Sequence, residues 1–156
     1  MNKERVLVSG EAIKDYIPQR EPIIMVDAFY GMEENRSFSG LTVSKDNIFV
    51  ESGLLNESGI IEHIAQSCAV RVGYACKQQN IPVPVGYIGA LKNIKISALP
   101  QVGQQLFTTI TVLQEVFDIT LVSIEVKVDE SIIAAGEMKI FLDKQFNPQK
   151  NTIFAP

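Results

Sequence analysis

Hydrophobic residues follow two different periods along this chain, and the change between them separates a helical part from a sheet part. Residues 59–77, GIIEHIAQSCAVRVGYACK, are apolar on nearly every side of a helix. That pattern is typical of a helix buried inside a protein. A polar cluster at residues 56–59 precedes the segment, and polar residues followed by Pro82 close it.

After this segment the hydrophobic period becomes two, which indicates strands with one packed face. The short connections between them favour antiparallel neighbours, so the predicted fold is α+β, a curved antiparallel meander around one long helix. Strands are predicted at residues 85–96, 105–117, 122–128 and 132–142, with a strand or extended segment at 23–30 and short strands at 36–43 and 47–50.

Composition predicts one globular domain over residues 1–156, because the 156-residue chain has 46% hydrophobic and 21% charged residues. Its core is expected at about residues 11–143, with a loose tail at 147–156.

A net charge of −4 offers no attraction for nucleic acid. No apolar run approaches the roughly 20 residues of a membrane span, and residues 1–10 do not resemble a signal peptide. We therefore expect a cytoplasmic protein without membrane contact.

The two cysteines, Cys68 and Cys76, lie eight residues apart in the predicted helix. That separation is too long for a disulfide within one helix, and it is not the spacing of metal ligands. We expect both to pack in the core, and we expect no metal site.

Glu62 stands near the start of the apolar helix, where burial of a carboxylate is costly unless a partner compensates. It is therefore either a capping device or a working acid. At about 100° per residue, Gln66, Ala69 and Gly73 share one stripe with Glu62. This stripe could admit a slim, extended ligand, or it could serve close packing of the helix.

Two motifs carry a family resemblance. Residues 16–27, YIPQREPIIMVD, look like the opening motif of 3-hydroxyacyl-(acyl-carrier-protein) dehydratases, Leu-Pro-His-Arg-x-Pro followed by aliphatic residues and Val-Asp. Residues 51–66, ESGLLNESGIIEHIAQ, are similar to the start of the central helix of these enzymes, with its Glu-x-x-Ala-Gln. The order of the segments resembles the hotdog fold, an antiparallel curved sheet wrapped around a central helix.

The absence of a Gly-His-Phe-Pro element makes the chain look more like the dehydratase-like branch from aryl-polyene and flexirubin pigment clusters. Residues 87–90 and 135–137 also fit that branch, and the resemblance covers about residues 11–142. It implies an acyl thioester substrate in fatty-acid or polyene-pigment type biosynthesis. No cofactor is implied beyond the phosphopantetheine of an acyl carrier protein or coenzyme A that carries the substrate.

Dehydration of a 3-hydroxyacyl thioester needs a base for the C2 proton and an acid for the departing hydroxyl. The resemblance assigns the acid to Glu62, oriented by Gln66; the alternative is a capping residue that reaches back to Gly59. The family's catalytic histidine is replaced by Gln19, an amide that cannot take up a proton. Gln19 could anchor the thioester or hold a water, or it could be an ordinary loop residue.

His63 has the intrinsic pKa of a base, but it projects about 100° away from Glu62 along the helix. It is thus a candidate catalytic residue or a hydrogen-bonded histidine at the interface. Substrate contacts are expected from the stripe and from the start of the helix, at Gly59, Gln66, Ala69 and Gly73.

The resemblance also implies a dimer with sites at the interface, either a homodimer or a heterodimer with a histidine-bearing homologue. Arg20 and Lys95 are candidates for contacting an acidic carrier protein, while strand alternation is expected to turn Lys92 to the opposite face from Lys95. Two other functions fit the residues: an acyl thioesterase, and a non-catalytic acyl- or carrier-binding subunit of a heterodimeric dehydratase.

Overall fold

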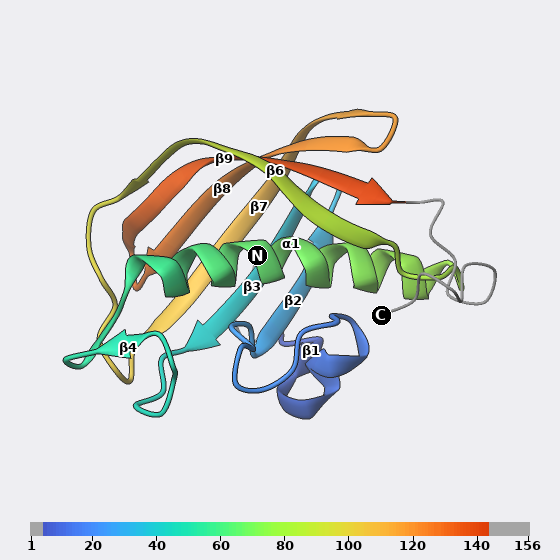
Figure 1. Ribbon diagram of the computed structural model, residues 1–156. Coiled ribbons are helices and arrows are strands. Elements are labelled where there is room, and N and C mark those ends of the chain that lie inside the picture. The colour runs from blue at the N-terminus through green and yellow to red at the C-terminus, as the bar shows by residue number, and fades with distance from the viewer. Residues whose placement is uncertain (1–4, 144–156) are drawn as a thin grey trace.

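A long helix, α1 (Glu57–Gln78), runs along the concave side of a strongly curved sheet (Figure 1). The computed structural model describes residues 5–143, without the side chain of Val85. Seven strands form this sheet in the order β1-β2-β3-β7-β8-β9-β6, and every neighbouring pair is antiparallel. The strands are β1 (Val8–Ser9), β2 (Ala28–Glu33), β3 (Arg36–Thr42), β6 (Val85–Ile96), β7 (Gln105–Val116), β8 (Ile119–Val128) and β9 (Ser131–Asp143).

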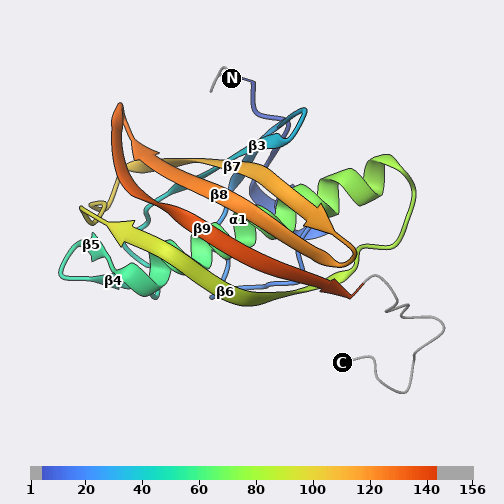
Figure 2. The ribbon, with the colours of Figure 1, turned by 90° about the horizontal axis from the view of Figure 1, so that it is seen from above.

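Two smaller elements flank the sheet and the helix. A 3-10 helix, η1 (Gly10–Asp15), follows β1, and the short strands β4 (Val50–Glu51) and β5 (Leu54–Leu55) form a two-stranded sheet before α1. This is the predicted α+β layout, and strands β6 to β9 cross over the helix when the molecule is viewed from above (Figure 2).

The predicted helix is confirmed, and it begins two residues earlier than the hydrophobic pattern indicated. Asn56 is the N-cap, and its side-chain oxygen accepts the N–H of Gly59 at 2.9 Å. Asparagine is among the preferred residues at this position because its side chain satisfies an otherwise unpaired N–H of the first turn.

The four long strands after the helix are also confirmed, but their predicted succession as neighbours is wrong for the first of them. β6 pairs with β9 at the edge of the sheet, whereas β7 pairs with β3. The link at residues 97–104 is not a tight turn, so among these four strands the rule that short connections join neighbours holds for β7–β8 and β8–β9. Of the strand predicted at residues 47–50, only Val50 lies in a strand, β4; the residues before it form a turn, in which the side-chain oxygen of Asn47 accepts the N–H of Phe49. The tail predicted at 147–156 lies outside the described residues.

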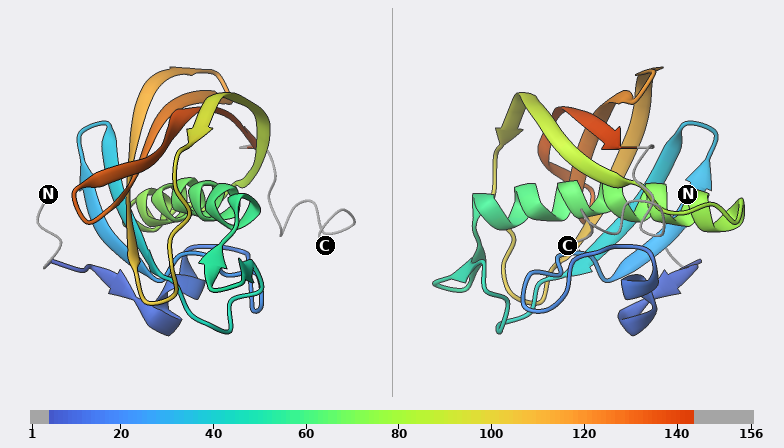
Figure 3. Two further views of the ribbon diagram at one scale, coloured as in Figure 1. Left: turned by 90° about the vertical axis from the view of Figure 1, so that its left-hand side faces the viewer. Right: turned by 45° about the vertical axis from the view of Figure 1, so that its right-hand side comes forward.

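Two apolar cores hold α1 from different sides. The larger lies between the helix and the sheet and includes the predicted inward face of β8, at Val122, Ile124, Val126 and Val128. The smaller joins Val70 of α1 to the N-terminal segment, which covers the helix on the side away from the sheet (Figure 3). Cys68 and Cys76 are buried and lie outside any disulfide, as predicted. No helix in residues 5–143 has the length and apolar character needed to cross a membrane.

Replacement of Gly73 tests how tightly the N-terminal segment packs on α1. A Cβ at this position would lie 2.0 Å from the carbonyl oxygen of Tyr16. Alanine normally stabilises a helix interior relative to glycine by about 1 kcal/mol. We expect Gly73→Ala to have the opposite sign and to lower the free energy of unfolding by about 1–3 kcal/mol, measured by urea denaturation.

Gly86→Ala is the matched control. The nearest atom to its Cβ would be the flexible side-chain end of Leu142, at 3.3 Å, and Ile140 and the carbonyl of Phe141 would lie in ordinary contact at 3.9 and 4.0 Å. We expect a change within about 0.5 kcal/mol. Equal effects of the two substitutions would show that the N-terminal segment does not press on the helix.

Candidate active site

Gln66 on α1 links the proposed acid to the opening motif. Its Nε2 donates to Glu62 Oε2 at 2.9 Å and to the carbonyl of Ile23 at 2.8 Å. Its Oε1 accepts the N–H of Met25 at 2.6 Å, and the side chain is fully buried. With both amide hydrogens and the oxygen engaged, the side chain cannot rotate without losing hydrogen bonds in a buried place.

Glu62 is half-buried, one helical turn before Gln66. Because the N-cap is Asn56, Glu62 lies in the second turn, beyond the reach of a capping box. The capping alternative is therefore wrong. The hydrogen bond from Gln66 orients one carboxyl oxygen of Glu62, and the carboxyl has no other hydrogen bond within residues 5–143.

His63 is held in the core by hydrogen bonds at both ring nitrogens. Nδ1 lies 2.6 Å from the carbonyl oxygen of Met25, and Nε2 lies 2.7 Å from Thr108 Oγ1. A carbonyl can only accept, so Nδ1 carries the proton and Nε2 accepts from the threonine hydroxyl. Complete burial lowers the pKa of His63 to about 4. This arrangement corresponds to the hydrogen-bonded alternative and offers Glu62 no base.

Gln19 lies in the loop between η1 and the extended segment that leads into β2. It is half-buried, and its Oε1 is shielded from solvent without a hydrogen-bond donor in the described part of the chain. The adjacent Arg20 is exposed, but its Nη1 donates to the carbonyls of Ile17 and Gln19 at 2.8 and 2.7 Å. The loop thus presents one free amide acceptor and no proton-accepting base.

Packing within the protomer closes much of the predicted ligand stripe. A Cβ at Gly59 would lie 2.6 Å from Phe49 Cβ, and Gly73 is pressed against Tyr16. Gly59, Gly73 and the buried Gln66 therefore serve close packing of the helix, and not contact with a ligand. Of the stripe, Glu62 and Ala69 stay half-buried, and they adjoin the half-buried Ile61, Ala65 and Val72 on the helix. A helical wheel could not show which side the N-terminal segment covers.

The two lysines of β6 lie on the same face of the sheet, contrary to the prediction from alternation. Lys92 pairs with Glu137 and Lys95 with Ala135, so three steps on β6 match two on β9. The extra residue is accommodated at Asn93, which has a φ of 53°. A β-bulge of this kind shifts the alternation by one residue. Both lysines are exposed.

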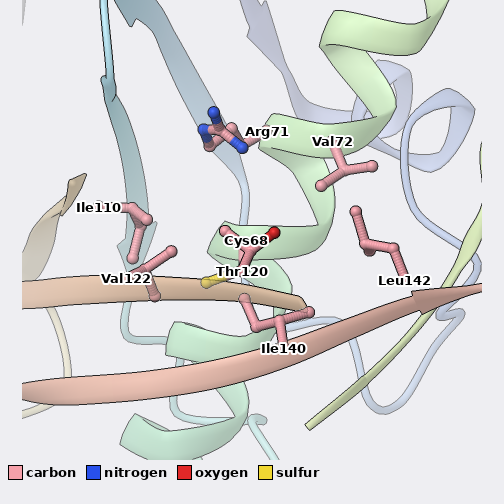
Figure 4. Close-up of a pocket in the computed structure, with 8 residues that line it drawn as sticks. All are labelled: Cys68, Arg71, Val72, Ile110, Thr120, Val122, Ile140 and Leu142. Carbon is pink, nitrogen blue, oxygen red and sulfur yellow. The ribbon is translucent and has the colours of Figure 1, made fainter. Parts of the chain in front are cut away.

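The two described pockets lie away from Glu62 and Gln19. One lies between α1 and strands β7 to β9 (Figure 4). The other lies on the outer side of the sheet and includes Asp27, whose Oδ2 accepts the N–H of Thr42 at 2.9 Å. Burial raises the pKa of Asp27.

No group of three or more histidine, cysteine, aspartate or glutamate residues in the described chain is arranged to hold a metal ion.

The model of the ApeP-like family, described as ApeP dehydratase, matches residues 11–151. The chain belongs to this family. It is accordingly a dehydratase-like protein of acyl thioesters, and the resemblance of the opening and helix motifs is confirmed at the level of the family. No curated protein matches the sequence.

Solved structures share the hotdog fold. The dehydratase heterocomplex ApeI:P from Xenorhabdus doucetiae contains a chain with a TM-score of 0.78 at 17% identity, over 92% of this chain and 97% of that one. The PaaI protein of the phenylacetic acid degradation operon of E. coli matches with a TM-score of 0.55 at 17% identity, over 72% and 80%. A hypothetical thioesterase with coenzyme A from Streptococcus pneumoniae TIGR4 matches with a TM-score of 0.59 at 9% identity, over 73% and 83%.

Burial of neutral His63 predicts a pH-dependent stability. The pKa of His63 is about 4 in the folded chain, below its ordinary value of 6.5, so the unfolded chain binds the proton more tightly. We expect the free energy of unfolding to fall as the pH drops from about 6.5 to about 4, by up to about 3 kcal/mol. Urea denaturation at several pH values measures this slope.

The control is His63→Gln, which removes the titrating group. We expect this variant to be less stable at pH 7 but to lose the part of the slope above pH 5, where few carboxylates titrate. A slope that is unchanged in the variant would show that His63 is not buried in its neutral form.

Proposed function

We propose that this chain is a subunit of a 3-hydroxyacyl thioester dehydratase in which Glu62 is the acid and a homologous partner chain supplies the histidine base. The observation that carries the proposal is an oriented acid without a base. Glu62 is held by Gln66, whereas Gln19 replaces the usual histidine and His63 is engaged in the core. Neither described pocket includes Glu62, which is consistent with a site that is complete only in a dimer.

The reaction divides between the two chains. The partner's histidine removes the C2 proton, and the C2–H electrons form the C2=C3 double bond as the C3–O bond breaks. Protonated Glu62 gives its proton to the departing hydroxyl, which leaves as water. The proton on the histidine then returns to Glu62 through solvent. In this scheme Gln19 faces the partner's own acid, where its neutral amide cannot take up a proton.

An exposed sheet edge supports association through β6. Among the described strands, β6 pairs only with β9, so its other edge presents unpaired backbone groups. Tyr87, Ile88 and Leu91 on this strand are 58%, 47% and 45% exposed. An unprotected apolar edge strand is a template for pairing with another chain. A partner strand added here would extend the sheet and bring two hotdog units together.

The substrate is proposed to arrive on the phosphopantetheine arm of an acidic acyl carrier protein, in fatty-acid or polyene-pigment type biosynthesis. Lys92 and Lys95 support this because the bulge at Asn93 places both on one exposed face. Positive side chains on an acidic protein give local complementarity to an acidic partner. Arg20, next to Gln19, is the third candidate contact, and coenzyme A is the alternative carrier.

Restoring the missing base tests the proposed chemistry. We expect the wild-type chain alone to show no hydration of a crotonyl thioester and no dehydration of a 3-hydroxybutyryl thioester. Gln19→His should create both activities, with a gain of at least about 100-fold over the wild type. Adding Glu62→Gln should abolish that gain, and Glu57→Gln, at an exposed position of the first turn, should preserve it.

Thiol release from the same substrates separates dehydration from thioester hydrolysis. Hydrolysis by the wild-type chain that disappears in Glu62→Gln would contradict the proposal and identify a thioesterase. Absence of any dehydratase activity in the folded Gln19→His variant would also contradict it.

Charge placed on the β6 edge tests the proposed association. We expect Leu91→Lys to shift the chain from dimer towards monomer in sedimentation experiments, because a lysine opposes edge pairing. Leu113→Lys on β7 is the control, since Leu113 is 51% exposed but distant from this edge in the strand order. Equal masses for both variants would place the interface elsewhere.

A further inference from the structure

The pocket on the outer side of the sheet is an open hollow of about 340 Å³, where β2, β3 and β7 meet the N-terminal segment. Pockets that bind small molecules have volumes of about 300–1,000 Å³, so this hollow has room for a ligand. We call it the Asp27 pocket. Its lining residues are Val6, Gly10, Asp27, Ala28, Tyr30, Leu41, Thr42, Gln105 and Leu106.

Small residues on β2 and β3 leave space on this face of the sheet, and Tyr30 forms a wall beside it. Ala28 and Gly40 are register partners, so they lie side by side on the same face. The ring of Tyr30 covers Gly40, because a Cβ at this glycine would lie 3.1 Å from Tyr30 Cε2. The ring also packs on Phe107, with 5.3 Å between the two ring centroids. The pocket is therefore built from packed strands.

Asp27 brings a carboxylate to this pocket without a counter-charge. The residue is half-buried, and its Oδ2 accepts the N–H of Thr42 at 2.9 Å. Within residues 5–143 it forms no ion pair. Burial raises the pKa of this carboxyl, and the hydrogen bond from Thr42 offsets the effect only in part. A carboxylate withdrawn from water is costly until a positive group pairs with it.

Two further oxygen atoms of the pocket lack donors. The hydroxyl of Tyr30 forms no hydrogen bond in the described part of the chain, and its pKa is raised by burial and also by the charge of Asp27. Gln105 Nε2 donates to Thr42 Oγ1 at 3.3 Å, which leaves Gln105 Oε1 as a free acceptor. Carboxylate and amide oxygens only accept, and a phenol oxygen can accept as well. A positively charged group with several N–H donors complements this set of oxygens.

We propose that the Asp27 pocket binds a primary alkylammonium group, with the ammonium at the Asp27 carboxylate and the alkyl chain between Tyr30 and Val6. An ammonium has three N–H donors and no acceptor, which matches the oxygens of this pocket. A tyrosine ring attracts such a cation through its face, and Val6 offers an apolar contact to the chain. A free alkylamine and a lysine side chain of another protein present this same chemistry.

This site is separate from the proposed acid. Glu62 belongs to α1, which runs along the concave side of the sheet, whereas the Asp27 pocket lies on the outer side (Figure 1). Neither Glu62 nor Gln19 lines the pocket. Binding of an ammonium therefore requires neither the dehydratase reaction nor the partner's histidine. The inference can fail while the proposed function holds, and the reverse is also true.

Titration of the full chain with n-butylammonium at low ionic strength, followed by NMR of the labelled backbone amides, tests the proposal directly. We expect saturable shifts that include the Thr42 amide, at least about tenfold weaker binding of butanol, and no binding of butyrate. Butyltrimethylammonium keeps the charge but has no N–H donor, so it should bind several-fold more weakly than butylammonium.

The methylamide of Nα-acetyl-lysine distinguishes the two sources of the ammonium. If it binds as well as butylammonium, the pocket also admits a lysine side chain, and if it binds more weakly, the free amine is the ligand. Either result supports an ammonium site.

Substitutions locate the binding. Asp27→Asn keeps an oxygen for the Thr42 N–H but removes the charge, and we expect it to weaken butylammonium binding at least about tenfold. Asp118→Asn is the matched control, because Asp118 is also half-buried but follows the opposite end of β7. It should leave binding unchanged.

Gln105→Glu provides a second test, which holds even if Asp27→Asn fails to fold. It adds a carboxylate at an exposed position of the pocket and should tighten butylammonium binding several-fold. Gln114→Glu adds the same charge near the other end of β7 and should have no effect. The absence of saturable butylammonium binding would overturn the proposal. Equal effects of the two aspartate variants, or of the two glutamine variants, would also overturn it, since they would show a general attraction to a negatively charged protein.

Discussion

The structure depends on the hydrogen bonds that two side chains of α1 make to the backbone of the extended segment before β2. Gln66 accepts the N–H of Met25, and His63 donates to the carbonyl of the same residue. Both side chains are fully buried, so neither has water as an alternative partner. Because unpaired polar groups in the interior are costly, the helix and the opening motif can dock in one register only.

The hydrogen bonds that stabilise this docking also position the side chain that is proposed for catalysis. The same Gln66 amide that binds Met25 and Ile23 also orients Glu62, so the position of the proposed acid is fixed by a contact that the fold requires. His63 is engaged by the same arrangement, because its second ring nitrogen accepts a hydrogen bond from Thr108. Residues 5–143 therefore contain an oriented carboxyl and no free histidine, and the proposed dehydratase reaction depends on what a second chain supplies.

The sequence was sufficient to predict the long elements, because burial leaves a periodic signal. The helix and the four long strands after it could be read from that signal, whereas the acid role proposed for Glu62 came from the resemblance to a family. Contacts between distant segments leave no such signal. The pairing of β6 with β9, the cover of the N-terminal segment over Gly73 and the bond from Thr108 to His63 each join residues far apart in the chain. The bulge at Asn93 was missed because one inserted residue is invisible to a period of two.

Mixing two inactive forms of the chain tests the shared site most directly. One is the wild type, which has the acid but no base, and the other is Gln19→His/Glu62→Gln, which has a base but no acid. If residue 19 of one subunit faces residue 62 of the other, an equal mixture should show about a quarter of the dehydratase activity of Gln19→His, since half of the dimers are mixed and each has one complete site. A mixture as inactive as its components would contradict a site shared between subunits.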